Sequence, residues 1–200
     1  MTMVGVLALQ GAFIEHIKTL RGLGVDAVEV RLPEQLDGLD ALIIPGGEST
    51  TIGKLAASYA LLEPLRRFAA EKPVWGTCAG MIMLARDIGR DQPLLGVMDI
   101  TVNRNAFGRQ VDSFEADLAI AAIGSQPFHA VFIRAPIVSR IDDGVEVLAR
   151  LDDASIVAVR QGKAMATAFH PELTPDDRLH RYFLTDVAGP PLHESAPRTA

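Results

Sequence analysis

The chain contains 200 residues, 48% of them hydrophobic, which is enough for one domain with a substantial core. Its formal net charge is −6 at pH 7, and its Lys and Arg residues form no long basic block, which argues against nucleic acid or an anionic membrane as the partner. The single cysteine cannot form an intramolecular disulfide, and no basic segment precedes the first apolar run. No apolar run approaches the roughly 20 residues that span a bilayer. We therefore expect a cytoplasmic chain without a membrane segment.

Short β-type runs alternate with helical patterns in the first half of the chain. The expected elements are a strand at 3–9, a helix at 12–23, strands at 27–30 and 41–44, two helices within 51–70, a strand at 74–76 and a helix at 79–88. This alternation predicts βαβ units and a mostly parallel sheet. The runs "DALIIPGG" and "PVWGTC" are continuously apolar, so their strands should be central and covered by helices on both faces.

The second half of the chain has a different pattern. Between 97 and 169 we expect strands without intervening helices, in the stretches "VMDITVNR", "SFEADLAI", "HAVFIRAP", "VEVLARL", "SIVAVRQG" and "AMATAF". These should add antiparallel or mixed strands to the same fold. A helix at about 175–187 should close the domain, and the tail 189–200 has little to bury. The prediction is one α/β domain over 1–188 with a central mixed, mostly parallel sheet, followed by a disordered tail.

The lone cysteine lies in the stretch "GTCAG", where Gly76 and Gly80 flank Cys78 between an expected strand and an expected helix. This G-x-nucleophile-x-G form is typical of a strained turn that lifts a nucleophile clear of the sheet, with small neighbours that let strand and helix pack closely. The N-terminus of the following helix favours a thiolate. An inert core cysteine is the alternative, and this pentapeptide alone leaves the two interpretations balanced.

A second constellation, "HPE", ends the last apolar strand. Proline favours an extended conformation of His170, and residues i and i+2 of an extended chain point to the same side, so Glu172 can reach the imidazole. Cys78, His170 and Glu172 can then act as nucleophile, base and orienter. An isolated H-P-E is more often a solvated strand end, but its pairing with the cysteine turn favours catalysis. The other histidines have no such partner in sequence and are interpreted as surface or structural: His16, His129, His180 and His193.

The stretch "LIIPGGESTT" adds a turn whose two glycines let backbone N–H groups face a ligand, as in many oxyanion holes. An ordinary strand-ending turn followed by a helix N-cap at Ser49 explains the same residues, and both interpretations can hold together. Glu48 would suit the ammonium group of a ligand, and Arg104 or Arg134 would suit its carboxylate. A zwitterionic amino acid fits this set.

These three motifs resemble those of the class I glutamine amidotransferases, the triad glutaminases. Further stretches narrow the resemblance, namely "GVLALQGAFIEH", "PGGESTTIGKL", "NRNAFGRQVDSFEADL", "FIRAP" and "FHPELT". Over about residues 3–187 the chain resembles the glutaminase subunits of bacterial pyridoxal 5'-phosphate synthases. The resemblance implies a single-domain, three-layer α/β/α fold of flavodoxin-like type. It also implies hydrolysis of L-glutamine to L-glutamate and ammonia through a γ-glutamyl thioester.

The resemblance further implies roles for individual residues. Cys78 would be the nucleophile, with His170 and Glu172 completing the triad. The glutamine-binding residues would be Gly46, Gly47, Glu48, Ser49, Arg104, Ile133 and Arg134. Gln10 would lie near the oxyanion site and respond to a partner subunit, unless it only caps the next helix. No ligand-spaced cluster of His, Cys and Asp occurs in the sequence, so we expect no metal, and no pyridoxal phosphate, in this chain.

The ammonia product implies a synthase partner, because free ammonia would be lost to solvent and largely protonated. In the resembled family this partner is a (β/α)8-barrel lyase with a dodecameric core, which makes pyridoxal 5'-phosphate, the active form of vitamin B6. The apolar N-terminal helix, with Phe13, Ile14 and Ile17, is a candidate contact. Plain core packing explains that apolar helix equally well.

Three other functions share parts of this pattern. The chain could supply ammonia to a different synthase, such as one for histidine or purine precursors, against which the stretch "GRQVDSFE" argues. It could be a catalytically silent module of the same fold, although such a module has no need of all three triad residues. It could also be a cysteine hydrolase of peptides or esters, but Glu48 with two arginines favours a free amino acid.

Overall fold

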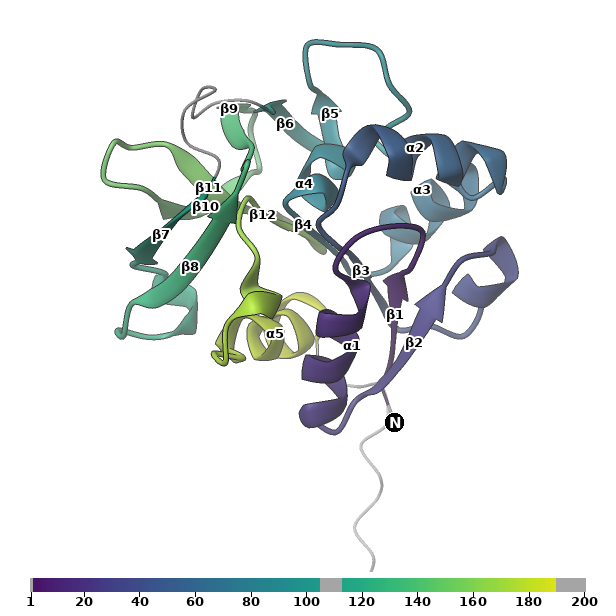
Figure 1. Cartoon of the computed structure of the whole chain (residues 1–200), viewed down its shortest axis with the longest axis horizontal. Helices are drawn as coiled ribbons and strands as arrows, with labels where there is room; N and C mark the ends of the chain where they lie inside the picture. Colours follow the sequence, from purple (N-terminus) through teal and green to yellow (C-terminus); the bar gives the residue numbers. More distant parts are fainter. Residues whose placement is uncertain (1, 105–112, 190–200) are drawn as a thin grey trace, which may run out of the picture.

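The computed structural model describes residues 2–104 and 113–189, and its first half alternates strands and helices as expected (Figure 1). The strands of this half are β1 (Met3–Leu7), β2 (Asp26–Val30), β3 (Ala41–Ile44) and β4 (Val74–Thr77). The helices are α1 (Phe13–Gly22), the 3₁₀ helix η1 (Pro33–Leu36), α2 (Ser49–Ser58), α3 (Leu62–Glu71) and α4 (Ala79–Leu84). Apart from the end of α4 and the unpredicted η1, these elements lie close to their predicted positions.

The second half consists mainly of strands. They are β5 (Ala85–Asp87), β6 (Met98–Asn103), β7 (Ser113–Leu118), β8 (Phe128–Ile133), β9 (Ile137–Ile141), β10 (Glu146–Arg150), β11 (Ile156–Gln161) and β12 (Ala164–Thr167). Short helices complete the fold, namely η2 (Ala121–Ile123), η3 (Pro171–Leu173), α5 (Arg178–Tyr182) and the π-helical turn η4 (Phe183–Val187).

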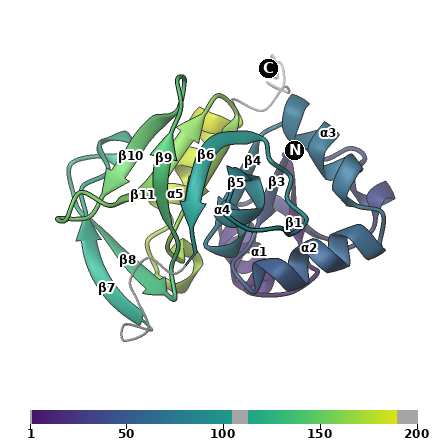
Figure 2. The same ribbon diagram turned by 90° about the horizontal axis from the view of Figure 1, so that it is seen from above.

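The main sheet has the strand order β2-β1-β3-β4-β12-β11-β9-β6-β5, and β10 pairs with β11 beside this path. Strands β2 to β12 of this order run parallel, whereas β11, β9 and β6 continue it with antiparallel pairings. Figure 2 shows α1 to α4 gathered around the parallel half and the antiparallel strands on the other side. The predicted single-domain α/β fold with a mixed, mostly parallel central sheet is therefore confirmed.

Residues of β4 that alternate along the strand face different helices. Trp75 contacts His16 of α1 and His180 of α5 with ring centroids 5.8 and 4.9 Å apart. Gly76 faces the other way, because a Cβ there would clash with the carbonyl group of Gly80 in α4. Since successive side chains of a strand point to opposite faces, α1 and α5 cover one face of the sheet and α4 covers the other. The central strand β4 is thus buried on both faces, as its continuous apolar run predicts.

Four details differ from the sequence-based expectation. The helix expected over 79–88 ends at Leu84, because the chain turns extended at Ala85 and pairs with β6 as β5. The helix expected from 175 begins at Arg178, since Asp176 accepts a hydrogen bond from the Arg178 backbone N–H and holds a turn there. Strand β9 was not predicted. Strands β7 and β8 form a separate two-stranded sheet instead of joining the main one.

Neither described range contains a helix that is both long and apolar enough to cross a membrane. The predicted tail lies outside the described residues from 190 onward. The same holds for residues 105–112, which include much of the stretch "GRQVDSFE". The predicted boundary between domain and tail therefore stays a prediction.

Candidate active site

Cys78 lies at the sharp turn between β4 and α4. Its backbone has φ 47° and ψ −102°, and its backbone N–H donates to the carbonyl oxygen of Thr167 at 2.8 Å. A Cβ at Gly80 would clash with the carbonyl oxygen of Ile44, so a glycine is needed where α4 crosses β3. The turn thus has both features that the sequence motif predicts, a left-handed nucleophile position and close contact through small residues.

His170 and Glu172 lie next to this turn. His170 Nδ1 and Glu172 Oε1 are 2.7 Å apart, and both residues are buried. The prediction that an extended chain brings Glu172 to His170 was wrong. His170 is followed by a 3₁₀ turn over Pro171–Leu173 rather than by extended chain, and this turn brings the carboxylate to the ring. The His170 backbone is fixed separately, since its N–H donates to the carbonyl oxygen of Val131 at 2.9 Å.

The imidazole of His170 is strongly basic in this setting. Burial disfavours its charged form, but hydrogen bonds with Cys78 and Glu172, and the negative charges on both, raise its pKa to about 10. His170 therefore carries a proton at neutral pH, held between a sulfur atom and a carboxylate. A protonated imidazole at this point can stabilise a thiolate and later give its proton to a leaving group.

The Pro-Gly-Gly turn after β3 packs directly against these groups. A Cβ at Gly46 would clash with the His170 ring, and one at Gly47 would clash with Gln10 Oε1. Gln10 Oε1 in turn accepts a hydrogen bond from the Glu48 backbone N–H at 2.6 Å. Gln10 therefore contacts the predicted oxyanion turn. It does not cap α1, whose N-cap residue is Ala12 without a side-chain hydrogen bond.

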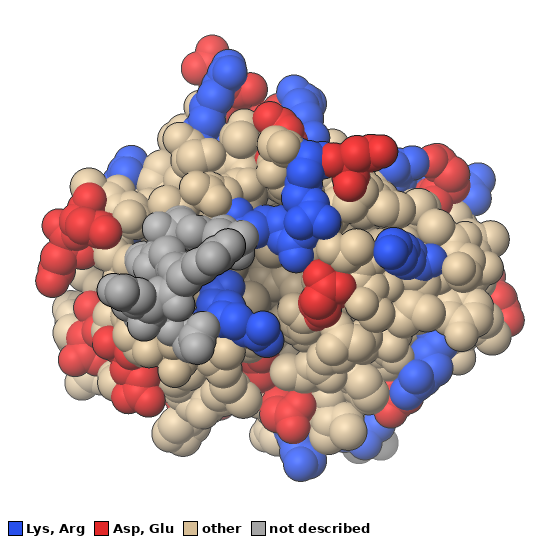
Figure 3. All heavy atoms as spheres, turned by 45° about the horizontal axis from the view of Figure 1, so that its top comes forward, with Lys and Arg blue, Asp and Glu red and all other residues tan. Residues whose placement is uncertain are grey.

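A cavity of about 310 Å³ opens above Cys78. Its lining residues are Gln10, Gly47, Glu48, Ser49, Cys78, Ala79, Ile82, Arg104, Ile133, Arg134 and His170. Every predicted site residue except Gly46 and Glu172 is among them, and these two lie directly behind His170. Figure 3 shows such a hollow, with basic side chains and an acidic side chain at its rim. The volume is that of a small-molecule site.

Glu48 and Arg104 meet at the rim of this cavity. Arg104 Nη2 donates to Glu48 Oε1 at 3.1 Å, while the Glu48 carboxylate also caps α2 by accepting from the backbone N–H groups of Thr50 and Thr51. Partial desolvation opposes the charge on Glu48, but the hydrogen bonds from Thr51 and Thr50 lower its pKa to about 2. Glu48 is therefore an anion at any physiological pH, as a partner for an ammonium group must be.

Comparisons with known proteins decide the family. The model of the SNO glutamine amidotransferase family matches residues 6–189. The chain belongs to this family. A relative from Herpetosiphon aurantiacus, named pyridoxal 5'-phosphate synthase subunit PdxT, is 63% identical over 186 residues, which cover 90% of this chain and 98% of the relative. One of the same name from Thermus thermophilus is 60% identical over 190 residues, covering 93% and 97% of the two chains.

Solved structures agree with this family assignment. A crystal structure of a glutamine amidotransferase, 57% identical, superposes with a TM-score of 0.87 and covers 92% of this chain and 98% of its own. A chain from the structure of PurLQS from Thermotoga maritima is only 17% identical but has a TM-score of 0.71, over 92% and 97% of the two chains. The second likeness shows the shared fold alone. The fold of this glutamine amidotransferase therefore extends well beyond its close relatives.

Gln92, in a loop of this SNO-family chain for which we predicted no role, forms hydrogen bonds with two residues of the site. Gln92 Oε1 accepts from Arg104 Nη1 at 3.1 Å, and Gln92 Nε2 donates to the buried Ser49 hydroxyl at 3.4 Å. The stretch 88–96 resembles no family motif, so no local signal pointed to it. Arg134 adds a second strained position, with φ 44° immediately after the Ile133 carbonyl, which faces Cys78 Sγ at 3.9 Å.

Of the remaining histidines, which the sequence analysis interprets as surface or structural, two are buried. His16 and His180 are fully buried, and His16 Nε2 lies 3.3 Å from Glu172 Oε2. His129 is exposed on β8 between Asp117 and Glu115, as a surface residue should be. His193 lies outside the described residues.

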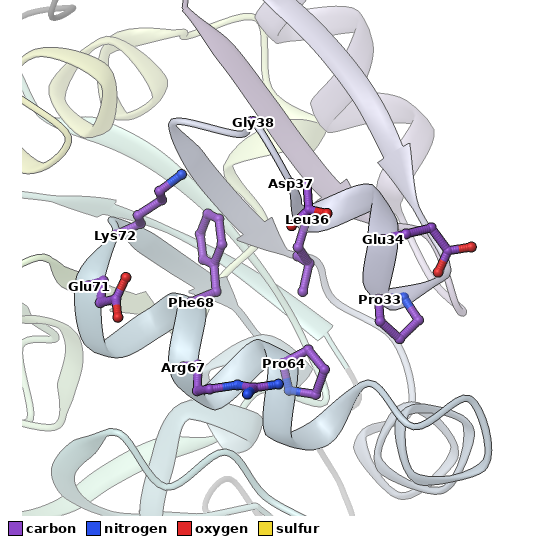
Figure 4. A pocket seen from close by; sticks show the side chains of 10 residues that line it. All are labelled: Pro33, Glu34, Leu36, Asp37, Gly38, Pro64, Arg67, Phe68, Glu71 and Lys72. Carbon is purple, nitrogen blue, oxygen red and sulfur yellow. The ribbon is translucent and has the colours of Figure 1, made fainter.

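A wider hollow of about 480 Å³ lies between η1 and α3 (Figure 4). Its lining includes Leu36 and Phe68 and shares no residue with the cavity above Cys78. It holds no nucleophile and no histidine among its lining residues. The smaller cavity is therefore the candidate active site of this glutamine amidotransferase.

Proposed function

We propose that this chain is the glutaminase subunit of a pyridoxal 5'-phosphate synthase and hydrolyses L-glutamine to L-glutamate and ammonia. Membership of the SNO glutamine amidotransferase family and relatives named PdxT support this assignment. The observation that carries the chemistry is the position of Cys78 on the wall of a small polar cavity, beside His170 and its 2.7 Å contact with Glu172. Such a set activates a thiol for acyl transfer.

In the first half-reaction, the thiolate of Cys78 attacks the side-chain amide carbon of glutamine. The carbonyl oxygen becomes an oxyanion, for which Gly47 and neighbouring backbone N–H groups are the proposed donors. His170 gives its proton to the departing nitrogen, the carbon–nitrogen bond breaks, and ammonia leaves. The carbon–sulfur bond that has formed is a γ-glutamyl thioester.

In the second half-reaction, water replaces the ammonia. His170, now neutral, takes a proton from this water while the oxygen attacks the thioester carbon. The carbon–sulfur bond then breaks, glutamate leaves, and the thiolate and protonated imidazole are restored. Glu172 keeps the ring oriented through both steps because its Oε1 holds His170 Nδ1 at 2.7 Å.

The charged residues of the cavity would select a free amino acid. Glu48 is the proposed partner of the glutamine ammonium group, and Arg104 and Arg134 are the proposed partners of its carboxylate. Ser49 and Ile133 line the space between them and are proposed to contact the ligand. A peptide or ester would leave part of this charged set unpaired in the cavity.

The ammonia is proposed to pass to a lyase subunit with a (β/α)8 barrel and a dodecameric core. The pyridoxal phosphate would be the product of that partner and not a cofactor of this chain. Gln10, which binds the Glu48 backbone next to the oxyanion turn, is the residue proposed to respond when the partner binds. The chemistry requires Cys78 as a free thiol, so a reducing, cytoplasmic location belongs to the proposal.

The decisive experiment measures glutamate release by the full chain alone, with the lyase subunit added, and after Cys78→Ala. We expect low activity alone, a clear rise with the lyase, and none in the variant, because Cys78 is the nucleophile. His129→Gln serves as the control, since His129 is an exposed histidine outside the cavity. Undiminished turnover by Cys78→Ala would refute the triad. Absence of binding or activation by the lyase would refute only the partner.

A further inference from the structure

A chain of buried polar side chains continues behind the triad. His16 of α1 places its Nε2 3.3 Å from Glu172 Oε2, and its Nδ1 3.0 Å from His180 Nε2 of α5. His16 and His180 are fully buried, and Glu172 is nearly so. Figure 1 shows α1 and α5 next to each other. The order of contacts is therefore Cys78, His170, Glu172, His16 and His180.

The second carboxylate oxygen of Glu172 depends on this arrangement. Oε1 is taken by His170 Nδ1, whereas among the described residues Oε2 has no partner with good hydrogen-bond geometry. At 3.3 Å, His16 Nε2 lies slightly beyond the usual length of an N–H···O bond, but it is the ion-pair contact that the described residues make with this oxygen. A buried carboxylate oxygen without any donor is costly, so a proton on His16 Nε2 is favoured.

The contact between His16 Nδ1 and His180 Nε2 bears on which nitrogen of His16 carries the proton. Burial, together with the neighbouring His180 and His170, lowers the pKa of His16, and burial lowers that of His180 to about 4. Both rings are therefore neutral at pH 7, and each carries one N–H. If His180 Nε2 donates to His16 Nδ1, the proton of His16 must be on Nε2, facing Glu172. The opposite direction would place a lone pair of His16 against the carboxylate.

Other groups around the pair fit this direction. Thr77 Oγ1 lies 3.3 Å from His16 Nε2, so the proton on this nitrogen can be shared between the Thr77 hydroxyl oxygen and the Glu172 carboxylate. His180 Nδ1 has no hydrogen-bond partner among the described residues, so the proton of His180 is favoured on Nε2, where His16 Nδ1 can accept it. The nearby carboxylate of Asp177 acts on His180 in the other direction, by favouring its charged form, but burial outweighs it.

We propose that His16 is a positioning residue of the triad, whose neutral Nε2–H holds Glu172 Oε2 so that Oε1 stays aimed at His170, with His180 fixing the tautomer of His16. The proposal rests on the proposed glutaminase function for its role in turnover. Its consequence is that the Glu172 carboxylate is held from both sides. Without His16, it can rotate away from His170 and leave the base poorly oriented.

The test compares His16→Leu, His16→Gln and His180→Phe with Leu20→Ala. Leu20 is the matched control, because it is fully buried one turn further along α1 and has no role in the site. We expect His16→Leu to lower kcat for glutamine about tenfold or more, the loss of roughly one hydrogen bond to a charged group, with KM changed less than about twofold. His16→Gln should recover part of kcat, because its amide N–H can reach Glu172. His180→Phe should show a smaller loss.

A second measurement does not need glutamine turnover. Because Cys78 is the only cysteine, the rate of its alkylation by iodoacetamide over a series of pH values reports the Cys78–His170 pair alone. His16→Leu should shift this pH profile, His16→Gln should shift it less, and Leu20→Ala should leave it in place. An unchanged profile and kcat in folded His16→Leu, or equal losses in Leu20→Ala, would overturn the proposal. If the profile shifts but the wild-type chain releases no glutamate either alone or with the lyase subunit, the proposed function fails and the positioning role stands.

Discussion

At the scale of single residues, Cys78 shows how a reactive position departs from ordinary backbone geometry. Its φ of 47° lies in the left-handed region, where a residue with a Cβ costs about 1–3 kcal/mol. The turn is nevertheless fixed, because the Cys78 N–H binds Thr167 and Gly80 packs on Ile44. The conformation points the thiol into the cavity, so the stability lost at this residue serves the site.

This strain can be measured with two variants that both lack the thiol. Cys78→Gly should be more stable than Cys78→Ala by about 1–3 kcal/mol in urea unfolding, because glycine accepts a positive φ freely. Ala57→Gly is the matched control, since Ala57 is exposed in the last turn of α2. There the same exchange should destabilise by about 0.5–1 kcal/mol. A similar loss at position 78 would show that the turn is unstrained.

At the scale of elements, the sequence pattern predicted the helices and strands whose ends depend on neighbouring residues along the chain. The ends of β3 match the prediction because a short apolar run between Asp40 and Pro45 leaves little choice. The end of α4 was missed because a continuous apolar run suits a buried helix and a buried strand equally. Strand β9 was missed because of its five residues only Val138 is fully buried. In the site, the motif residues were predictable, but the contact of His16 with Glu172 depends on tertiary packing.

The crossing of α4 over β3 should be the least tolerant point among these elements. Gly80→Ala would press a methyl group against the backbone carbonyl of Ile44, so we expect a loss of about 1–3 kcal/mol or more and a lower glutaminase rate. Gly22→Ala is the control, because Gly22 ends α1 with open space around its Cα. It should be neutral or stabilise the protein by up to about 1 kcal/mol. Thermal unfolding and turnover of both variants decide the matter, and equal stabilities would contradict the packing argument.

At the scale of the whole molecule, the two buried histidines link parts of the chain that are far apart in sequence. His16 comes from α1, His180 from α5, and Trp75 of the central strand contacts both rings. Trp75 Nε1 donates to Thr167 Oγ1 at 3.2 Å and so joins β4 to β12. A proton added to either imidazole should therefore destabilise this centre, since no described anion other than Glu172 lies within an ion-pair distance of either ring.

The fold should consequently lose stability in mild acid. The unfolded chain binds protons at its histidines near pH 6.5, whereas folded His180 binds one only near pH 4 and the pKa of folded His16 is also lowered. Between these values the unfolded state holds more protons, so stability falls as the pH falls from 6.5 towards 4, by up to about 1.4 kcal/mol per pH unit for each histidine. Urea midpoints measured from pH 7 to pH 4.5 should show this decline.

Two variants identify the groups responsible for that decline. His180→Phe should reduce the slope of stability against pH by up to about 1.4 kcal/mol per pH unit, the contribution of one proton. The variant has no group at this position that must stay neutral. His129→Gln should leave it as steep, because hydrogen bonds from its ring to Asp117 and Glu115 raise the pKa of His129, so that this residue adds stability in acid and loses it as the pH rises. Equal slopes in His180→Phe and the wild type would place the acid sensitivity outside the buried pair. Glu48 and Asp176, whose pKa values are lowered in the folded state, add a decline of their own only near and below about pH 5, where the unfolded chain begins to protonate its carboxylates, so the slope between pH 6.5 and about 5.5 reports the histidines.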